Sequence, residues 1–179
     1  MKQLLAIILL LFFINSCGSV KYNNLYTQND KIKAKKLERM LLTLSDNKEE
    51  ASTLATLAIT HSKRLANEYN LTSPPLYHNF LVNSGQRQKG LCYDFVDDLM
   101  KEINKRDFQS FYFRWGRANA NKLNEHNVIV VFGDKESRWE EGVVLDAWRD
   151  SGKLFFTKVK DDKKYNFLPW EEGDIRIAK

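Results

Sequence analysis

The fold of this chain is decided by the stretch Gly90-Leu91-Cys92-Tyr93-Asp94-Phe95-Val96-Asp97-Asp98-Leu99. Its apolar residues recur at helical spacing, at positions 95, 96, 99 and 103. Asp94 stands in the first turn, where a negative charge suits the positive end of the helix dipole, and Lys105 and Arg106 suit the other end. The stretch therefore predicts a helix that begins at or near Cys92 and ends near Lys105.

A cysteine at the start of a helix is placed for chemistry, because the free backbone N–H groups and the dipole favour a thiolate. Thiol catalysis also needs a base that holds the proton and a third group that orients the base. Two downstream residues are of the right type, His126 in Glu125-His126-Asn127 and Asp146 in Leu145-Asp146-Ala147-Trp148. We therefore predict a catalytic set of Cys92, His126 and Asp146.

The segment after the predicted helix is typical of β-strands, because its apolar residues alternate or run together. Strands are expected at about 111–115, 128–132, 142–145 and 153–159. His126 stands just before the second of these strands, and Asp146 follows the third. If the two strands pair antiparallel, both residues lie at the same end of the sheet and can be neighbours. The tail with Pro169 and Trp170 is expected to be irregular and to cover one edge of the sheet.

Helices are expected before residue 76. Residues 30–44 form an amphipathic pattern, and Asn47 with Glu50 resembles a capping box that opens a second helix to about Tyr69. Residues 76–82 predict one or two further helical turns. Helices followed by closely spaced strands indicate an α+β fold, in which the nucleophile helix packs on a small antiparallel sheet.

Three motifs follow one another in the order found in a known family: Gly90-Leu91-Cys92, Glu125-His126-Asn127-Val128 and Val144-Leu145-Asp146-Ala147-Trp148. This arrangement, over residues of about 85–160, resembles the transglutaminase-like branch of the papain-type cysteine fold. The resemblance implies that Cys92 is the nucleophile, His126 the base and Asp146 the orienting group. Trp115 or Trp148 would serve as the tryptophan that relatives often place beside the histidine's strand. Some relatives keep the fold without catalysis.

Other groups near these motifs leave alternatives open. The backbone N–H of Cys92 is one candidate donor to an oxyanion. Gln86 is a side-chain candidate by analogy with papain-type enzymes, although we favour a solvated loop residue at that position. Asn127 competes with Asp146 as the orienting group, but it adjoins His126 along a strand and so points to the opposite face.

The remaining histidines do not predict a metal site. Three histidines and one free thiol lack the clustered spacing of zinc ligands, and neither a metal nor a cofactor is expected. His78 is an alternative base, but its flanks are loop-like. His61 lies on the second helix, and we interpret it as structural or exposed.

The N-terminus is typical of an exported protein. Lys2 precedes the apolar run Leu4–Ile14, which is too short to span a bilayer and fits a signal-peptide core. The following Ile14-Asn15-Ser16-Cys17-Gly18-Ser19 resembles the bacterial lipobox. The resemblance implies a signal peptide at 1–16 and a lipid on Cys17, with Gly18 favouring the outer over the inner membrane. An ordinary cleaved signal or an uncleaved anchor are the alternatives.

These features divide the chain into a lipidated tether, 17–29, and a single domain, 30–179, anchored on the periplasmic side and expected to be monomeric. Within the domain a helical part, 30–75, precedes the transglutaminase-like core, 76–165. With Cys17 lipidated, Cys92 is an unpaired thiol in an oxidising compartment. Such a thiol is either buried as a small hydrophobe or active in chemistry.

The composition and charge limit the classes of function that we predict. The net charge of +5 is spread along the chain without a basic stripe interleaved with aromatics, so nucleic-acid binding is not predicted. We expect a thiol-dependent amide hydrolase or acyl transferase acting on a protein or a peptidoglycan stem peptide. The alternative is a catalytically inactive envelope module that binds a protein partner or the cell wall.

Overall fold

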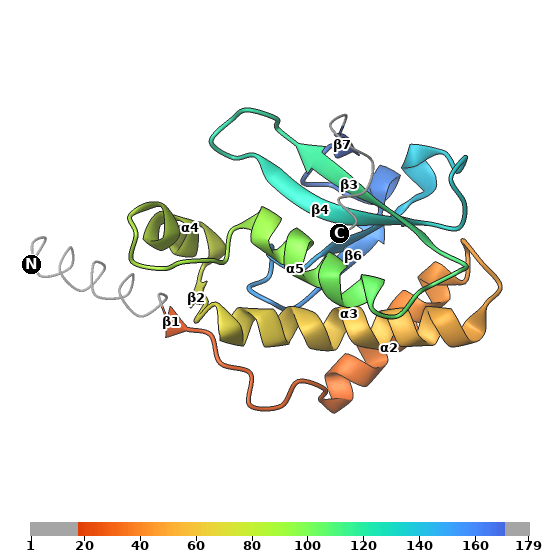
Figure 1. Cartoon of the computed structure of the whole chain (residues 1–179), viewed down its shortest axis with the longest axis horizontal. Coiled ribbons are helices and arrows are strands. Elements are labelled where there is room, and N and C mark those ends of the chain that lie inside the picture. Colours follow the sequence, from red (N-terminus) through yellow and green to blue (C-terminus); the bar gives the residue numbers. More distant parts are fainter. Residues whose placement is uncertain (1–17, 171–179) are drawn as a thin grey trace, which may run out of the picture.

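Helices come first along the chain and the main sheet second, in the computed structural model, which describes residues 18–170 (Figure 1). The helical part comprises β1 (Gly18–Ser19), α2 (Gln28–Leu41), α3 (Lys48–Glu68), β2 (Thr72–Ser73), α4 (Pro75–Asn83) and α5 (Cys92–Asn104). The strands of the sheet are β3 (Tyr112–Ala118), β4 (His126–Phe132), β5 (Val143–Asp146), β6 (Phe155–Lys158) and β7 (Leu168–Pro169). Short 3₁₀ turns cover Trp139–Glu141 and Val159–Asp161. The described chain is thus α+β, as predicted.

The first two helices begin at capping residues and pack against each other. The Thr27 side chain accepts a hydrogen bond from the Asp30 N–H at 3.3 Å, while the Asp30 carboxylate accepts from the Thr27 N–H. Asn47 caps α3 by accepting from the Glu50 N–H at 3.1 Å, as the sequence predicts. A capping side chain of this kind stabilises a helix by about 1 kcal/mol. A buried ion pair, Lys63 Nζ to Asp30 Oδ2 at 2.6 Å, joins the two helices.

The predicted nucleophile helix, α5, begins at Cys92. Asp94 reaches back and accepts hydrogen bonds from the N–H groups of Gly90 and Leu91 at 2.9 and 3.0 Å, which fixes the helix start. The buried face of α5 carries Phe95, Val96, Leu99, Met100 and Ile103. This face packs on β4, and the helix also contacts α3.

The five-stranded sheet is antiparallel throughout, in the order β6-β5-β4-β3-β7. Each residue of the central strand β4 is buried. Ile129, Val131 and Leu145 point into the core shared with the helices, and Val128 and Val130 point into a smaller core on the opposite face. Strand β7 pairs with the free edge of β3, which is the edge covering expected of the tail.

The segment before α2 lies against the domain from Gly18 onward. Gly18 pairs with Ser73 in the small β1–β2 ladder, and the Val20 N–H donates to the Leu71 carbonyl at 2.7 Å. The Tyr22 hydroxyl donates to the Ser151 carbonyl at 2.8 Å. The predicted signal peptide, 1–16, and the predicted lipidation site, Cys17, lie outside the described residues. Among residues 18–170 no helix combines the length and the apolar character needed to cross a bilayer.

Candidate functional site

The His126 ring and the Asp146 carboxylate meet at one end of the sheet, with Nε2 and Oδ2 2.6 Å apart. His126 opens β4 and Asp146 closes β5, and these strands pair antiparallel. Both side chains point to the same face of the sheet, because the pairing of β4 with β5 places the even-numbered residues of both strands on that face. Both residues are 1% exposed, so the contact is sheltered from water.

Asp146 is held as an anion by its own turn. Its Oδ1 accepts from the N–H groups of Trp148 and Arg149 at 3.1 and 3.0 Å, and Arg149 Nε donates to Oδ2 at 2.8 Å. Arg149 is fixed in turn by Asp162, with Nη2 and Oδ2 2.6 Å apart. Burial alone would raise the pKa of Asp146, but the charges of His126 and Arg149 outweigh it and lower that pKa.

The His126 ring is enclosed by aromatic side chains. The ring centroids of Tyr165, Trp148 and Phe167 lie 4.6, 4.9 and 5.7 Å from that of the imidazole. Burial in this shell disfavours the imidazolium, but the charge and hydrogen bond of Asp146, with smaller contributions from Cys92, raise the pKa of His126 to about 9. The ring is therefore protonated at neutral pH.

The Cys92 thiol lies beside the start of β4. Its Sγ accepts a hydrogen bond from Asn127 Nδ2 at 3.6 Å and lies 3.9 Å from the Glu125 carbonyl oxygen. These two contacts place the thiol next to the residues on either side of His126. Asp146 occupies Nε2 of the ring, whereas Nδ1 has no hydrogen-bond partner within residues 18–170. The structure thus joins His126 to Asp146 through one ring nitrogen, and it places the Cys92 thiol against the residues on either side of His126.

Asn127 was considered from the sequence only as a competing orienting group, and its contact with the thiol was not predicted. It points to the face opposite His126, as predicted, and on that face it meets the start of α5. Trp115 Nε1 donates to Asn127 Oδ1 at 2.7 Å, which turns Nδ2 towards Cys92. Strand alternation gives the face to which Asn127 points, but the packing of α5 on that face is not a local pattern of the sequence. Of the two candidate tryptophans, Trp115 therefore supports the amide and Trp148 packs on the imidazole.

The alternative base, His78, is engaged in the fold. Its Nδ1 accepts from the Thr72 N–H at 3.1 Å, and its Nε2 lies 2.9 Å from the Lys89 carbonyl oxygen. Both ring nitrogens of His78 are therefore used in contacts with the backbone. A Cβ on Gly90, whose φ is +125°, would lie 2.2 Å from His78 Nε2, so the glycine of the Gly-x-Cys motif makes room for this ring.

Gln86 is an exposed residue of the loop between α4 and α5. Its Nε2 donates to Ser84 Oγ at 3.0 Å. Within the described chain no hydrogen bond joins Gln86 to Cys92. The backbone N–H of Cys92, at the first position of α5, is among the groups that a helix leaves without an internal partner.

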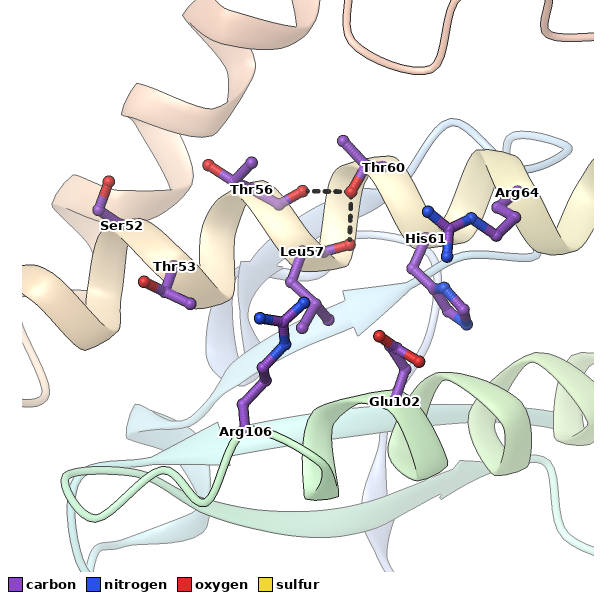
Figure 2. Close-up of a pocket in the computed structure, with 9 residues that line it drawn as sticks. All are labelled: Ser52, Thr53, Thr56, Leu57, Thr60, His61, Arg64, Glu102 and Arg106. Carbon is purple, nitrogen blue, oxygen red and sulfur yellow. Dashed lines mark hydrogen bonds between the residues drawn. The ribbon is translucent and has the colours of Figure 1, made fainter.

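A pocket of about 400 Å³ lies elsewhere, between α3 and α5 (Figure 2). His61 and Glu102 point towards each other across it, and Arg64 and Arg106 border it. Burial lowers the pKa of His61, and its Nδ1 has no partner in the described part of the chain. The pocket contains no thiol. Across residues 18–170, no group of three or more histidine, cysteine, aspartate or glutamate side chains is arranged to hold a metal ion.

Comparisons with known proteins do not assign the chain to a family. No family model and no solved structure matches it. Among curated proteins, the CRISPR-associated endoribonuclease Cas13a of Leptotrichia buccalis is 30% identical over 94 residues. That match covers 50% of this chain but only 7% of Cas13a.

Proposed function

We propose that this chain is a thiol-dependent amide hydrolase or acyl transferase with a transglutaminase-like, papain-type catalytic domain. The observation that carries the proposal is His126, which bonds Asp146 through Nε2 and lies between Glu125 and Asn127, the two residues that contact the Cys92 sulfur. Thiol catalysis requires an imidazole that an orienting group holds near the thiol. The order of the motifs, with Gly-x-Cys opening a helix and the histidine opening a strand, supports the same family.

The charges at the site fit nucleophilic attack on an amide carbonyl. In the proposed step His126 holds the proton while the Cys92 Sγ forms a bond to the carbonyl carbon. His126 then passes its proton to the leaving amine as the C–N bond breaks, and an acyl-enzyme remains. Water or a second amine attacks the thioester, gives its proton to His126 and releases the thiolate. The Cys92 N–H and Asn127 Nδ2 are the candidate donors to the oxyanion.

We further propose that the domain is carried on the periplasmic side of a bacterial membrane, preferably the outer membrane, by a lipid on Cys17. The apolar run Leu4–Ile14 and the lipobox-like sequence after it support this location. The substrate would then be an amide bond in an envelope protein or in a peptidoglycan stem peptide. The endoribonuclease activity in the Cas13a name is not carried over, because 7% of that protein is matched.

Alkylation of Cys92 by iodoacetamide tests the site. Cys92 should react at pH 7 faster than a free thiol standard, and His126→Gln should slow the reaction because the imidazolium is lost. Cys92→Ala gives the background. A wild-type protein that is folded by circular dichroism yet unreactive would contradict the proposal. Mass spectrometry of peptidoglycan and envelope proteins incubated with the wild type and with Cys92→Ala then identifies the amide that is cleaved or transferred.

The burial of the thiol favours a second candidate, a module that keeps the fold and binds a partner without turnover. Cys92 is 6% exposed and His126 1% exposed, so both are largely buried in the folded chain. This module would capture the same envelope protein or cell-wall material when Cys92 and His126 are both replaced by alanine. Loss of capture or of phenotype in a folded double variant would argue against it.

A further inference from the structure

Helix α4 carries apolar side chains on its outward face. Leu76, Tyr77 and Phe80 are 67%, 41% and 59% exposed, and they are neighbours on one side of a helix. The Tyr77 and Phe80 rings are stacked, with centroids 6.2 Å apart. The inward face is occupied by His78 and Leu81, which are buried. A group of large apolar side chains on a surface indicates a contact that is absent from the isolated chain.

The outward face of α4 lies next to the point at which the described chain begins. Gly18 pairs with Ser73, and α4 starts two residues later at Pro75. Figure 1 shows β1, β2 and α4 together at one end of the molecule. One residue spans at most about 3.6 Å, so an anchor on Cys17 would hold the membrane surface close to this end.

The composition of the face suits a lipid surface. Aromatic side chains with a leucine are typical of segments that lie in the interface between headgroups and acyl chains. An apolar face that enters the interface adds its buried area to the attachment that a covalent lipid provides. We propose that Leu76, Tyr77 and Phe80 insert into the surface of the bilayer that holds the anchor. This inference rests on the proposed lipid anchor and adds a second membrane contact to it.

Contact of α4 with a membrane would orient the candidate catalytic site. His78 of α4 bonds the backbone of Thr72 and Lys89 on either side of the helix. Trp148, which packs on His126, donates from Nε1 to Asn79 Oδ1 at 3.0 Å. Helix α4 is thus bonded both to the loop before α5 and to the tryptophan that packs on His126. A membrane contact of α4 would therefore hold the Cys92 thiol at a fixed height above the lipid.

Spin labels on the lipidated full chain test the inference. In a Cys92→Ala background, Leu76→Cys and Ile32→Cys each provide one labelling position, since Cys17 would carry the lipid. Ile32 is the matched control, an apolar side chain on α2 that is 50% exposed. In vesicles of phosphatidylethanolamine and phosphatidylglycerol, the label at position 76 should be accessible to oxygen and shielded from a water-soluble nickel chelate. The label at position 32 should show the reverse.

The outcomes separate the two proposals. If the protein does not sediment with the vesicles and mass spectrometry finds no lipid on Cys17, the anchor is wrong. If the lipidated protein sediments but both labels remain accessible to the nickel chelate, the α4 inference alone is overturned. Dipolar broadening between labels at position 76 would also overturn it, because the face would then be covered by a second copy. Shielding of position 76 that needs an added envelope protein would overturn it in favour of a protein partner.

Discussion

Asn127 donates a hydrogen bond to the Cys92 sulfur over 3.6 Å, from the face of β4 opposite His126. The thiol therefore has an amide donor on the strand that also carries His126. Since Trp115 holds the amide oxygen, the donor group of Asn127 cannot turn away without breaking a buried bond. The site is thus supported from both faces of the sheet.

Asn127→Asp should slow the alkylation of Cys92 about tenfold at pH 7, because a hydrogen bond to a charged group contributes roughly 1.5–3 kcal/mol. The substitution keeps the shape and the acceptor for Trp115, but places a negative charge beside the thiolate. Asn124→Asp, in the exposed loop before β4, makes the same change in net charge and should leave the rate unchanged. Equal rates for both variants would show that Asn127 has no part in activating the sulfur.

Gly90→Ala should destabilise the domain by at least about 2 kcal/mol more than Gly85→Ala in urea unfolding. Both glycines have positive φ, +125° and +77°, so both substitutions strain the backbone. Only at position 90 does the new Cβ collide with the His78 ring, at 2.2 Å, whereas nothing lies within 4 Å at position 85. A similar loss of stability in the two variants would mean that the His78 contact gives way freely.

The stability of the wild type should fall as the pH rises from about 6.5 towards 9. The pKa of His126 is raised to about 9 in the folded protein, against about 6.5 in an unfolded chain. Between these values the folded state binds more protons, so its stabilisation is complete below pH 6.5 and is lost through pH 9. This contribution is up to about 3 kcal/mol at 1.36 kcal/mol per pKa unit. His126→Gln, measured by urea unfolding over the same range, should lack this part of the slope; parallel curves would refute the assignment.

Arg149→Met should lower the free energy of unfolding by about 3 kcal/mol, because it leaves two carboxylates without their shared cation. Arg149 contacts Asp146 at 2.8 Å and Asp162 at 2.6 Å, and its side chain is 7% exposed. Arg138→Met removes an exposed arginine that pairs with Glu141 and should change thermal or urea unfolding little. If the two variants lose equal stability, the buried network is not what holds the Asp146 turn.

Sequence reasoning reached the parts of the fold that depend on local pattern. The start of α5 at Cys92 followed from helical spacing and from Asp94, which indeed closes the helix start. The meeting of His126 and Asp146 followed from two adjacent strands and the antiparallel rule. Both predictions needed only neighbouring elements and the period of their side chains.

The contacts that the sequence did not predict depend on where elements far apart in the chain cross. The Asn127 amide meets Cys92 because α5 packs on β4 at one particular position, which no local pattern specifies. The Arg149 pair with Asp162 needs a return of the chain over the sheet. The role of His78 needs the loop before α5 to pass beneath it. Such contacts are set by the packing of the whole core rather than by any one segment.

The bond between the Tyr22 hydroxyl and the Ser151 carbonyl has a practical consequence for preparing this protein. The Tyr22 ring also covers Gly152, where its nearest carbon would lie 3.2 Å from an added Cβ. A recombinant protein that begins at α2 would lack Tyr22. The surface that Tyr22 covers would then be exposed and prone to aggregation. Expression of the domain alone should therefore start at Gly18, and a protease that cuts between Gly18 and Thr27 should shorten the lifetime of the purified protein.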